Sequence, residues 1–309
     1  MRVQRRKNKL NKKNLKGGGG RTATTLQKVH KTFRYFGGKN KLVTPIVDII
    51  NKQADAYKYL YDKTPVLIEP FCGSAVISFN VPSHKFSKII INDKSRAITS
   101  YFRCVKQNHI SLIEKIEELS ETFCRDKFYE YRDLLEEDNV EELTRAAMFF
   151  MVLNSSYLAR ADKGTTYALD LDGKDEEYEI EKIVDRAKKR IPANHFRMLN
   201  YNIVVENMDY KNLMDKYKDE DRIIYLDPPY APETLQYKSS GGRSGTPKKA
   251  PYICSFTSED IVDCINLLKE EKYIVCSFYD PKSLFNPEDK EYRSFDELER
   301  TERGFWKEM

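Results

Sequence analysis

Short apolar runs recur along the chain, and most of them end at a turn that is followed by a helical pattern. The runs are Val66 to Ile68, Ile89 to Ile91, Ile203 to Val205, Ile223 to Leu226 and Tyr273 to Phe278. Strands of this length that alternate with helices are typical of parallel α/β units. The pattern therefore predicts an α/β fold around one parallel sheet. A helix capped at Thr257 or Ser258 is expected before the last strand.

The pattern changes between residues 105 and 198, where apolar residues recur at helical spacing. Ser111 with Glu114 predicts a capping box at the start of one helix, and Asn139 predicts the cap of another. A hairpin is expected in the same section, from Thr165 to Leu169, Asp172-Gly173 and Tyr178 to Ile180. We interpret the whole section as a helical insertion into the sheet domain.

Charge separates the start of the chain from the remainder. The net charge is +5, yet residues 1–47 hold 14 Lys/Arg and no Asp/Glu, which leaves 39 basic and 48 acidic residues, a net of −9, in the rest. Such arms bind nucleic acid through phosphate charge, although a solvated tail or a targeting signal has the same composition. The expected parts are a flexible basic arm (1–25), a sheet domain (26–104 and 199–309) and the helical insertion (105–198).

Cysteine and histidine usage argues against metal centres and disulfides. The six cysteines lie far apart without a Cys-x-x-Cys pair, and there are only four histidines. We therefore expect no metal site, and a reducing, cytoplasmic setting. The longest uncharged apolar run near the middle, Ala146 to Leu153, is too short to cross a bilayer, so no membrane segment is expected.

The most specific motif is Asp227-Pro228-Pro229-Tyr230, which directly follows an expected strand. Two successive prolines fix the backbone and place a carboxylate and a carbonyl at the carboxyl edge of the sheet, where α/β folds bind ligands. Both groups accept hydrogen bonds from an amino group and stabilise positive charge that develops on it. Tyr230 offers a flat face for a base rotated out of a duplex. Taken alone, the motif is equally compatible with a rigid turn.

A second motif predicts a nucleotide-binding turn. Glu69-Pro70-Phe71-Cys72-Gly73-Ser74 follows a strand, and Gly73 lets a ligand approach the backbone. Asp93 lies 20 residues later at the end of the next strand, where a carboxylate accepts hydrogen bonds from ribose hydroxyls. Upstream, the segment Tyr35 to Lys39 offers an aromatic face, two glycines and a lysine that can meet a carboxylate, unless it is only a basic loop.

These motifs, in this order, resemble those of the Dam-like, alpha-ordered family of DNA adenine methyltransferases over residues 33 to 280. The matching segments are Tyr35 to Lys39, Glu69 to Ala75, Asp93, Met208-Asp209, Asp227 to Tyr230 and Ser255-Phe256-Thr257. The resemblance implies a Rossmann-like α/β methyltransferase sheet whose helical insertion recognises the target. It also implies S-adenosylmethionine as cofactor, double-stranded DNA as substrate with the adenine flipped out, and a cognate restriction endonuclease as a candidate partner.

The resemblance assigns roles to individual residues. The catalytic residues it implies are Asp227, Pro228, Pro229 and Tyr230. The cofactor-binding residues it implies are Tyr35, Lys39, Glu69, Phe71, Gly73, Asp93, Asp209 and Asp227.

Three departures from the family pattern bear on these expectations. Tyr35 replaces the usual tryptophan, and Ala75 replaces the second glycine of the cofactor motif. Asn154 to Arg160 stands in place of the usual Asn-Arg-x-x-x-Asn-Gly segment, so the family's target sequence does not carry over. The closing segment of many relatives is not recognised before Met309, so the final hairpin is expected to be shortened or absent.

The same residues bear on other activities. A cytosine ring methyltransferase needs a cysteine nucleophile, usually after proline, and the chain has no Pro-Cys dipeptide. Cytosine amino-methyltransferases resemble Ser-Pro-Pro-Tyr, and protein glutamine methyltransferases Asn-Pro-Pro-Tyr. RNA adenine methylation and a non-catalytic nucleic-acid-binding protein stay open as alternatives. We also expect the loop from Glu233 to Tyr252 to close over DNA.

Overall fold

The computed structural model describes residues 29–170, 173, 175–229, 237–238, 244–245, 253–254, 256–278, 292–294 and 303–307. The expected arm (1–25), Tyr230 and most of the loop 233–252 lie outside the described residues. In the described part, no helix is both long and apolar enough to span a bilayer.

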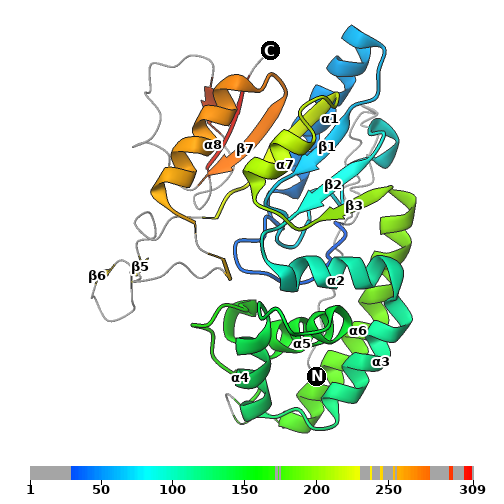
Figure 1. Ribbon diagram of the computed structural model, residues 1–309, viewed down its shortest axis with the longest axis vertical. Coiled ribbons are helices and arrows are strands. Elements are labelled where there is room, and N and C mark those ends of the chain that lie inside the picture. Colours follow the sequence, from blue (N-terminus) through cyan, green and yellow to red (C-terminus); the bar gives the residue numbers. More distant parts are fainter. Residues whose placement is uncertain are drawn as a thin grey trace, which may run out of the picture.

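A seven-stranded sheet forms the centre of the α/β fold (Figure 1). Its strands are β1 (Val66–Glu69), β2 (Ile89–Asn92), β3 (Ile203–Glu206), β4 (Arg222–Leu226), β7 (Ile274–Phe278), β8 (Tyr292–Ser294) and β9 (Arg303–Lys307). The order is β3-β2-β1-β4-β7-β9-β8, and β1, β2, β3, β4 and β7 are parallel. The five expected strands are thus confirmed. A final hairpin is present, because β9 pairs antiparallel with both β7 and β8. The expectation that it could be absent is therefore wrong. A separate short pair joins β5 (Tyr237–Lys238) to β6 (Ser244–Gly245).

Helices cover both faces of the sheet, which explains why its strands are continuous apolar runs. On one face, Leu67, Ile223 and Val275 pack in a cluster with Ile46 and Ile50 of α1 (Val43–Tyr61). On the other face, β4 packs against α7 (Tyr210–Lys216) and α8 (Ser258–Glu270). Figure 1 shows α7 and α8 in front of the sheet and α1 behind it.

Five helices lie between β2 and β3 in the chain. They are α2 (Arg96–Gln107), α3 (His109–Ser120), α4 (Arg125–Leu134), α5 (Glu142–Ser155) and α6 (Glu176–Asn200). Two short 3-10 helices, η1 (Ser83–Lys85) and η2 (Tyr157–Ala159), complete the described helices. In Figure 1, α3 to α6 form a second layer below the sheet.

Three local predictions in this section are wrong, and one elsewhere is confirmed. Ser111 lies inside α3, which begins at His109. Glu141 caps α5 in place of Asn139, because its carboxylate accepts from two backbone N–H groups. At α8, the capping box of Thr257 with Asp260 confirms the expected cap.

The prediction of a hairpin is also wrong, because Tyr178 to Ile180 lie near the start of α6. Asp175 caps this helix by accepting from the Tyr178 N–H. Acidic residues in the first turn interact favourably with the positive end of the helix dipole. Within Thr165 to Leu169, Tyr167 instead forms an isolated antiparallel β-bridge with Ser156.

Asn194 joins α6 to the start of the described chain and to α2. Its side chain is 1% exposed. Asn194 Oδ1 lies 2.7 Å from His30 Nε2, and its amide donates to the Tyr101 hydroxyl at 3.2 Å and to the Thr32 carbonyl at 3.4 Å. This one side chain therefore joins three segments, with partners on two of them and Asn194 itself on α6.

Replacing Asn194 by alanine is expected to lower the free energy of unfolding by about 1–3 kcal/mol, because the buried partners lose their hydrogen bonds. Urea denaturation followed by circular dichroism measures the change. Asn200→Ala is the matched control, since Asn200 is exposed on the same helix and is expected to stay within about 0.5 kcal/mol of wild type. Equal losses in the two variants would contradict the prediction.

Candidate active site

A pocket lies where the turns after β1, β2 and β4 meet the segment 35–39 and the starts of α7 and α8. It encloses about 960 Å³, part of which is open to solvent. The sequence-predicted residues that line it are Tyr35, Lys39, Glu69, Phe71, Gly73, Asp93, Asp209, Asp227, Pro228 and Pro229. The structure thus brings together every predicted site residue except Tyr230, which is not among the described residues.

Asp227 is held by two contacts on the same carboxylate oxygen. Lys39 Nζ lies 2.9 Å from Asp227 Oδ1, and the side chains are 4% and 17% exposed, respectively. The Ser277 hydroxyl donates to Oδ1 at 2.9 Å and also lies 3.0 Å from the hydroxyl of Tyr225. The carboxylate expected to meet Lys39 is therefore that of Asp227 itself.

Sequence reasoning missed Ser277 and Tyr225. Both lie on expected strands, β7 and β4, and are buried. Their hydroxyl groups within apolar runs could have indicated a role, because a buried hydroxyl needs a hydrogen-bond partner. Only the pairing of β4 with β7 reveals that the partner belongs to the site.

The turn after β1 is shaped by Gly73 and Ala75. Gly73 has a φ of 45°, and a Cβ placed there would lie 3.2 Å from the ring of Tyr35. Its N–H donates to Asp93 Oδ2 at 3.0 Å, while Oδ1 accepts from the Ser95 N–H at 2.9 Å. Asp93 thus fixes the turn and still borders the pocket. Burial raises the pKa of Asp93 to about 6.

Asn92 connects two turns of the pocket, a role that no sequence motif indicated. Its amide donates to the carbonyls of Pro70 at 2.9 Å and Met208 at 3.0 Å. Its Oδ1 accepts from the Met208 N–H at 3.0 Å. The turn after β1 and the turn after β3 are therefore joined through one buried side chain.

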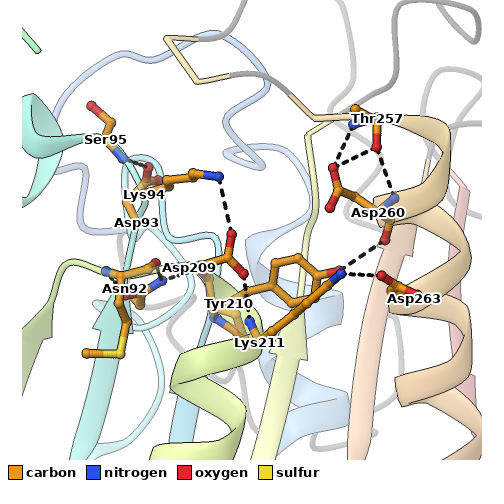
Figure 2. A network of polar contacts seen from close by, with 12 residues as sticks. Asn92, Asp93, Lys94, Ser95, Asp209, Tyr210, Lys211, Thr257, Asp260 and Asp263 are labelled. Atoms are coloured by element: carbon orange, nitrogen blue, oxygen red, sulfur yellow. Dashed lines mark hydrogen bonds and ion pairs between the residues drawn. The ribbon is translucent and has the colours of Figure 1, made fainter.

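Asp209 lies on the wall formed by α7. It caps that helix by accepting from the Lys211 N–H at 3.1 Å, and it pairs with Lys94 at 3.2 Å (Figure 2). Lys211 in turn pairs with Asp263 of α8. These contacts hold α7 against both β2 and α8.

Aromatic side chains make an apolar wall beside these polar groups. The Phe71 ring lies 5.1 Å from that of Tyr210 and 5.5 Å from that of Phe256, which it meets at 90°. Rings in this arrangement can receive a flat aromatic ligand. Within the described ranges, no cluster of His, Cys, Asp or Glu is suited to hold a metal ion.

Glu69 is the most deeply buried carboxyl of the pocket. It is 3% exposed, and it accepts from the hydroxyl and the N–H of Ser78. Burial raises its pKa from the ordinary 4.5 to about 8, and the charges of Asp227 and Asp93 act in the same direction. Glu69 therefore keeps its proton at neutral pH.

This raised pKa predicts a pH-dependent stability. The folded state retains a proton that the unfolded state has lost between pH 4.5 and 8, so Glu69 stabilises fully below 4.5 and loses this contribution as pH rises to about 8. Glu69→Gln cannot ionise, so its stability relative to wild type should rise by a few kcal/mol across this window. Urea unfolding of both proteins at several pH values tests this. Parallel curves would show that Glu69 does not titrate as argued.

Comparison with known proteins gives two matches. Residues 35–257 match the family described as D12 class N6 adenine-specific DNA methyltransferase. The chain is also similar to the type II methyltransferase M.MjaIII of Methanocaldococcus jannaschii. The two are 25% identical over 214 residues, which cover 64% of this chain and 68% of that protein.

Proposed function

Because the chain belongs to the D12 class of N6 adenine-specific DNA methyltransferases, we propose that S-adenosylmethionine binds in the described pocket and that Asp227 holds the adenine amino group there. The observation that carries the proposal is the fixed carboxylate of Asp227 at the pocket wall. DNA adenine methylation is the activity of the family, and the proposal concerns which residues perform it.

The lining of the pocket fits the cofactor. Gly73 has no side chain, which allows the turn after β1 to lie close to the ring of Tyr35 at the pocket wall. Asp93 is placed to accept from ribose hydroxyls, and the rings of Phe71 and Phe256 suit the adenine. When bound, S-adenosylmethionine supplies a methyl group on a positively charged sulfur.

The chemical difficulty is that the lone pair of the target amine is delocalised into the adenine ring. Lys39 and Ser277 both contact Oδ1 of Asp227, and no hydrogen bond from the described residues reaches Oδ2. Oδ2 is therefore the oxygen available to the amine, together with the Pro228 carbonyl. As nitrogen becomes positively charged during attack, its attraction to the carboxylate grows, which lowers the barrier.

The substrate must reach a pocket at the edge of the sheet. An adenine stacked in a duplex cannot do so, and we therefore propose that it is flipped out and stacks on Tyr230. We assign target recognition to the helical layer of α3 to α6. A cognate restriction endonuclease is a proposed partner, on the ground that M.MjaIII is named a type II methyltransferase.

Asp227→Ala is expected to reduce methyl transfer by at least ~10²-fold, as removal of one transition-state contact does in other enzymes. Transfer of tritiated methyl groups to adenine in DNA, at saturating S-adenosylmethionine, measures the loss. Because the buried Lys39 loses its carboxylate partner, the variant also loses about 3–5 kcal/mol of stability. Asp227→Asn preserves the shape and serves as the second variant. A folded Asp227→Ala protein with near wild-type rates would refute the site.

Ser277 is expected to act as a positioning residue through Asp227. Ser277→Ala should lower kcat about tenfold, equivalent to ~1.4 kcal/mol, and leave the KM for S-adenosylmethionine nearly unchanged. Ser277→Thr keeps the hydroxyl and should restore most of the rate. If Ser277→Ala folded normally and kept the wild-type kcat, the hydrogen bond would have no part in orienting Asp227.

A further inference from the structure

Three arginines gather between α6 and the segment that precedes Tyr35. Arg186 and Arg190 lie one turn apart on α6, and Arg34 is an exposed residue at the end of that segment. Burial lowers the pKa of Arg186, and the positive charges of Arg190 and Arg34 lower it further. The positive charges of Arg190 and Arg34 thus both reach Arg186.

Among the residues that the structure describes, no carboxylate pairs with these three arginines. Within the described ranges, none of them forms an ion pair, and Arg186 Nη1 donates instead to Asn154 Oδ1 at 2.7 Å. The charge of Glu179 also reaches Arg186, but Glu179 pairs with Lys182. Like charges held together without an anion destabilise the fold.

Other cations of the helical layer do have partners. Arg125 pairs with Asp170, Lys127 with Glu130 and Lys188 with Glu117. The helix dipole does not explain the cluster either, because its effect falls off within the last turn of a helix, whereas α6 continues to Asn200, well beyond Arg190. An external anion is a more direct explanation. Guanidinium groups bind phosphate with two parallel hydrogen bonds, and duplex DNA carries one phosphate charge per about 1.7 Å of its axis.

The position of the cluster connects it to the pocket. Arg34 directly precedes Tyr35, which lines the pocket. On the other side, Asn154 lies at the end of α5, just before the exposed Tyr157 and Leu158. The cluster thus lies between the pocket and an exposed turn of the helical layer.

The sequence that precedes the cluster is also basic. His30 contacts Asn194 of α6, and its pKa is lowered by burial and also by Arg197 and Arg190. Residues 1–28, which hold ten Lys/Arg and no Asp/Glu, join the described chain just before this point. The segment that precedes the cluster in the sequence therefore carries charge of the same sign.

We propose that Arg34, Arg186 and Arg190 bind backbone phosphates of the DNA next to the target adenine. The proposal rests on the proposed function, since it assumes that DNA approaches this pocket. It assigns the three residues to substrate binding and to no step of methyl transfer.

Binding of a fluorescein-labelled DNA duplex of mixed sequence, followed by anisotropy at several NaCl concentrations, tests the proposal. In Arg186→Gln and Arg190→Gln, the slope of log affinity against log salt should flatten by about 0.9 for each phosphate that is no longer neutralised, and the KM for DNA should rise. Arg186→Lys should keep the slope. Lys188→Gln removes the same charge from the opposite side of α6, where Lys188 pairs with Glu117, and should change the slope less.

Arg34→Gln provides a variant at an exposed position that does not threaten the fold. If all three Arg→Gln variants bind DNA with the affinity and slope of Lys188→Gln, the proposal is overturned. Calorimetric titration with S-adenosylmethionine should give wild-type affinity in every variant. A wild-type protein that bound DNA through these arginines but transferred no methyl group would refute the proposed function and leave this inference standing.

Discussion

The ion pair between Lys39 and Asp227 is the interaction on which the pocket depends. A lysine that is 4% exposed is costly unless a carboxylate meets it, and here the partner comes from a strand end far along the chain. The pair therefore fixes the segment 35–39 over the end of β4. It also determines which oxygen of Asp227 contacts Lys39, and hence which one we propose for the substrate amine.

Charge is distributed in opposite senses inside and outside the pocket. Glu69, Asp93 and Asp227 border one cavity, and their proximity together with burial leaves Glu69 protonated. Outside, Arg34, Arg186 and Arg190 form a cluster of positive charge. The Asp227 carboxylate suits an amine that becomes cationic, and the arginine cluster suits phosphate. The two proposals thus assign each charge to a different part of one substrate.

The strands and most of the site could be predicted because both depend on local sequence. Val66 to Ile68 and Ile223 to Leu226 are apolar on both faces, which specifies buried parallel strands without further information. The caps of α3 and α5 were missed because several polar residues near each helix start can serve as caps, and packing selects among them. Ser277 and Asn92 act across strands, so their partners become visible only when the sheet order is known.

Ala75, which stands where the family pattern has glycine, indicates what the turn after β1 requires. Glycine is favoured at position 73 for two reasons. Its φ is 45°, and a Cβ there would lie 3.2 Å from the Tyr35 ring. Ala75 also has a positive φ, 51°, which costs roughly 1–2 kcal/mol for a residue with a Cβ. Its methyl group is fully buried in the core, and its N–H donates to the Cys72 carbonyl at 2.5 Å. The second position therefore needs only an unusual backbone angle and not empty space, so packing and a turn hydrogen bond can offset the strain of alanine there.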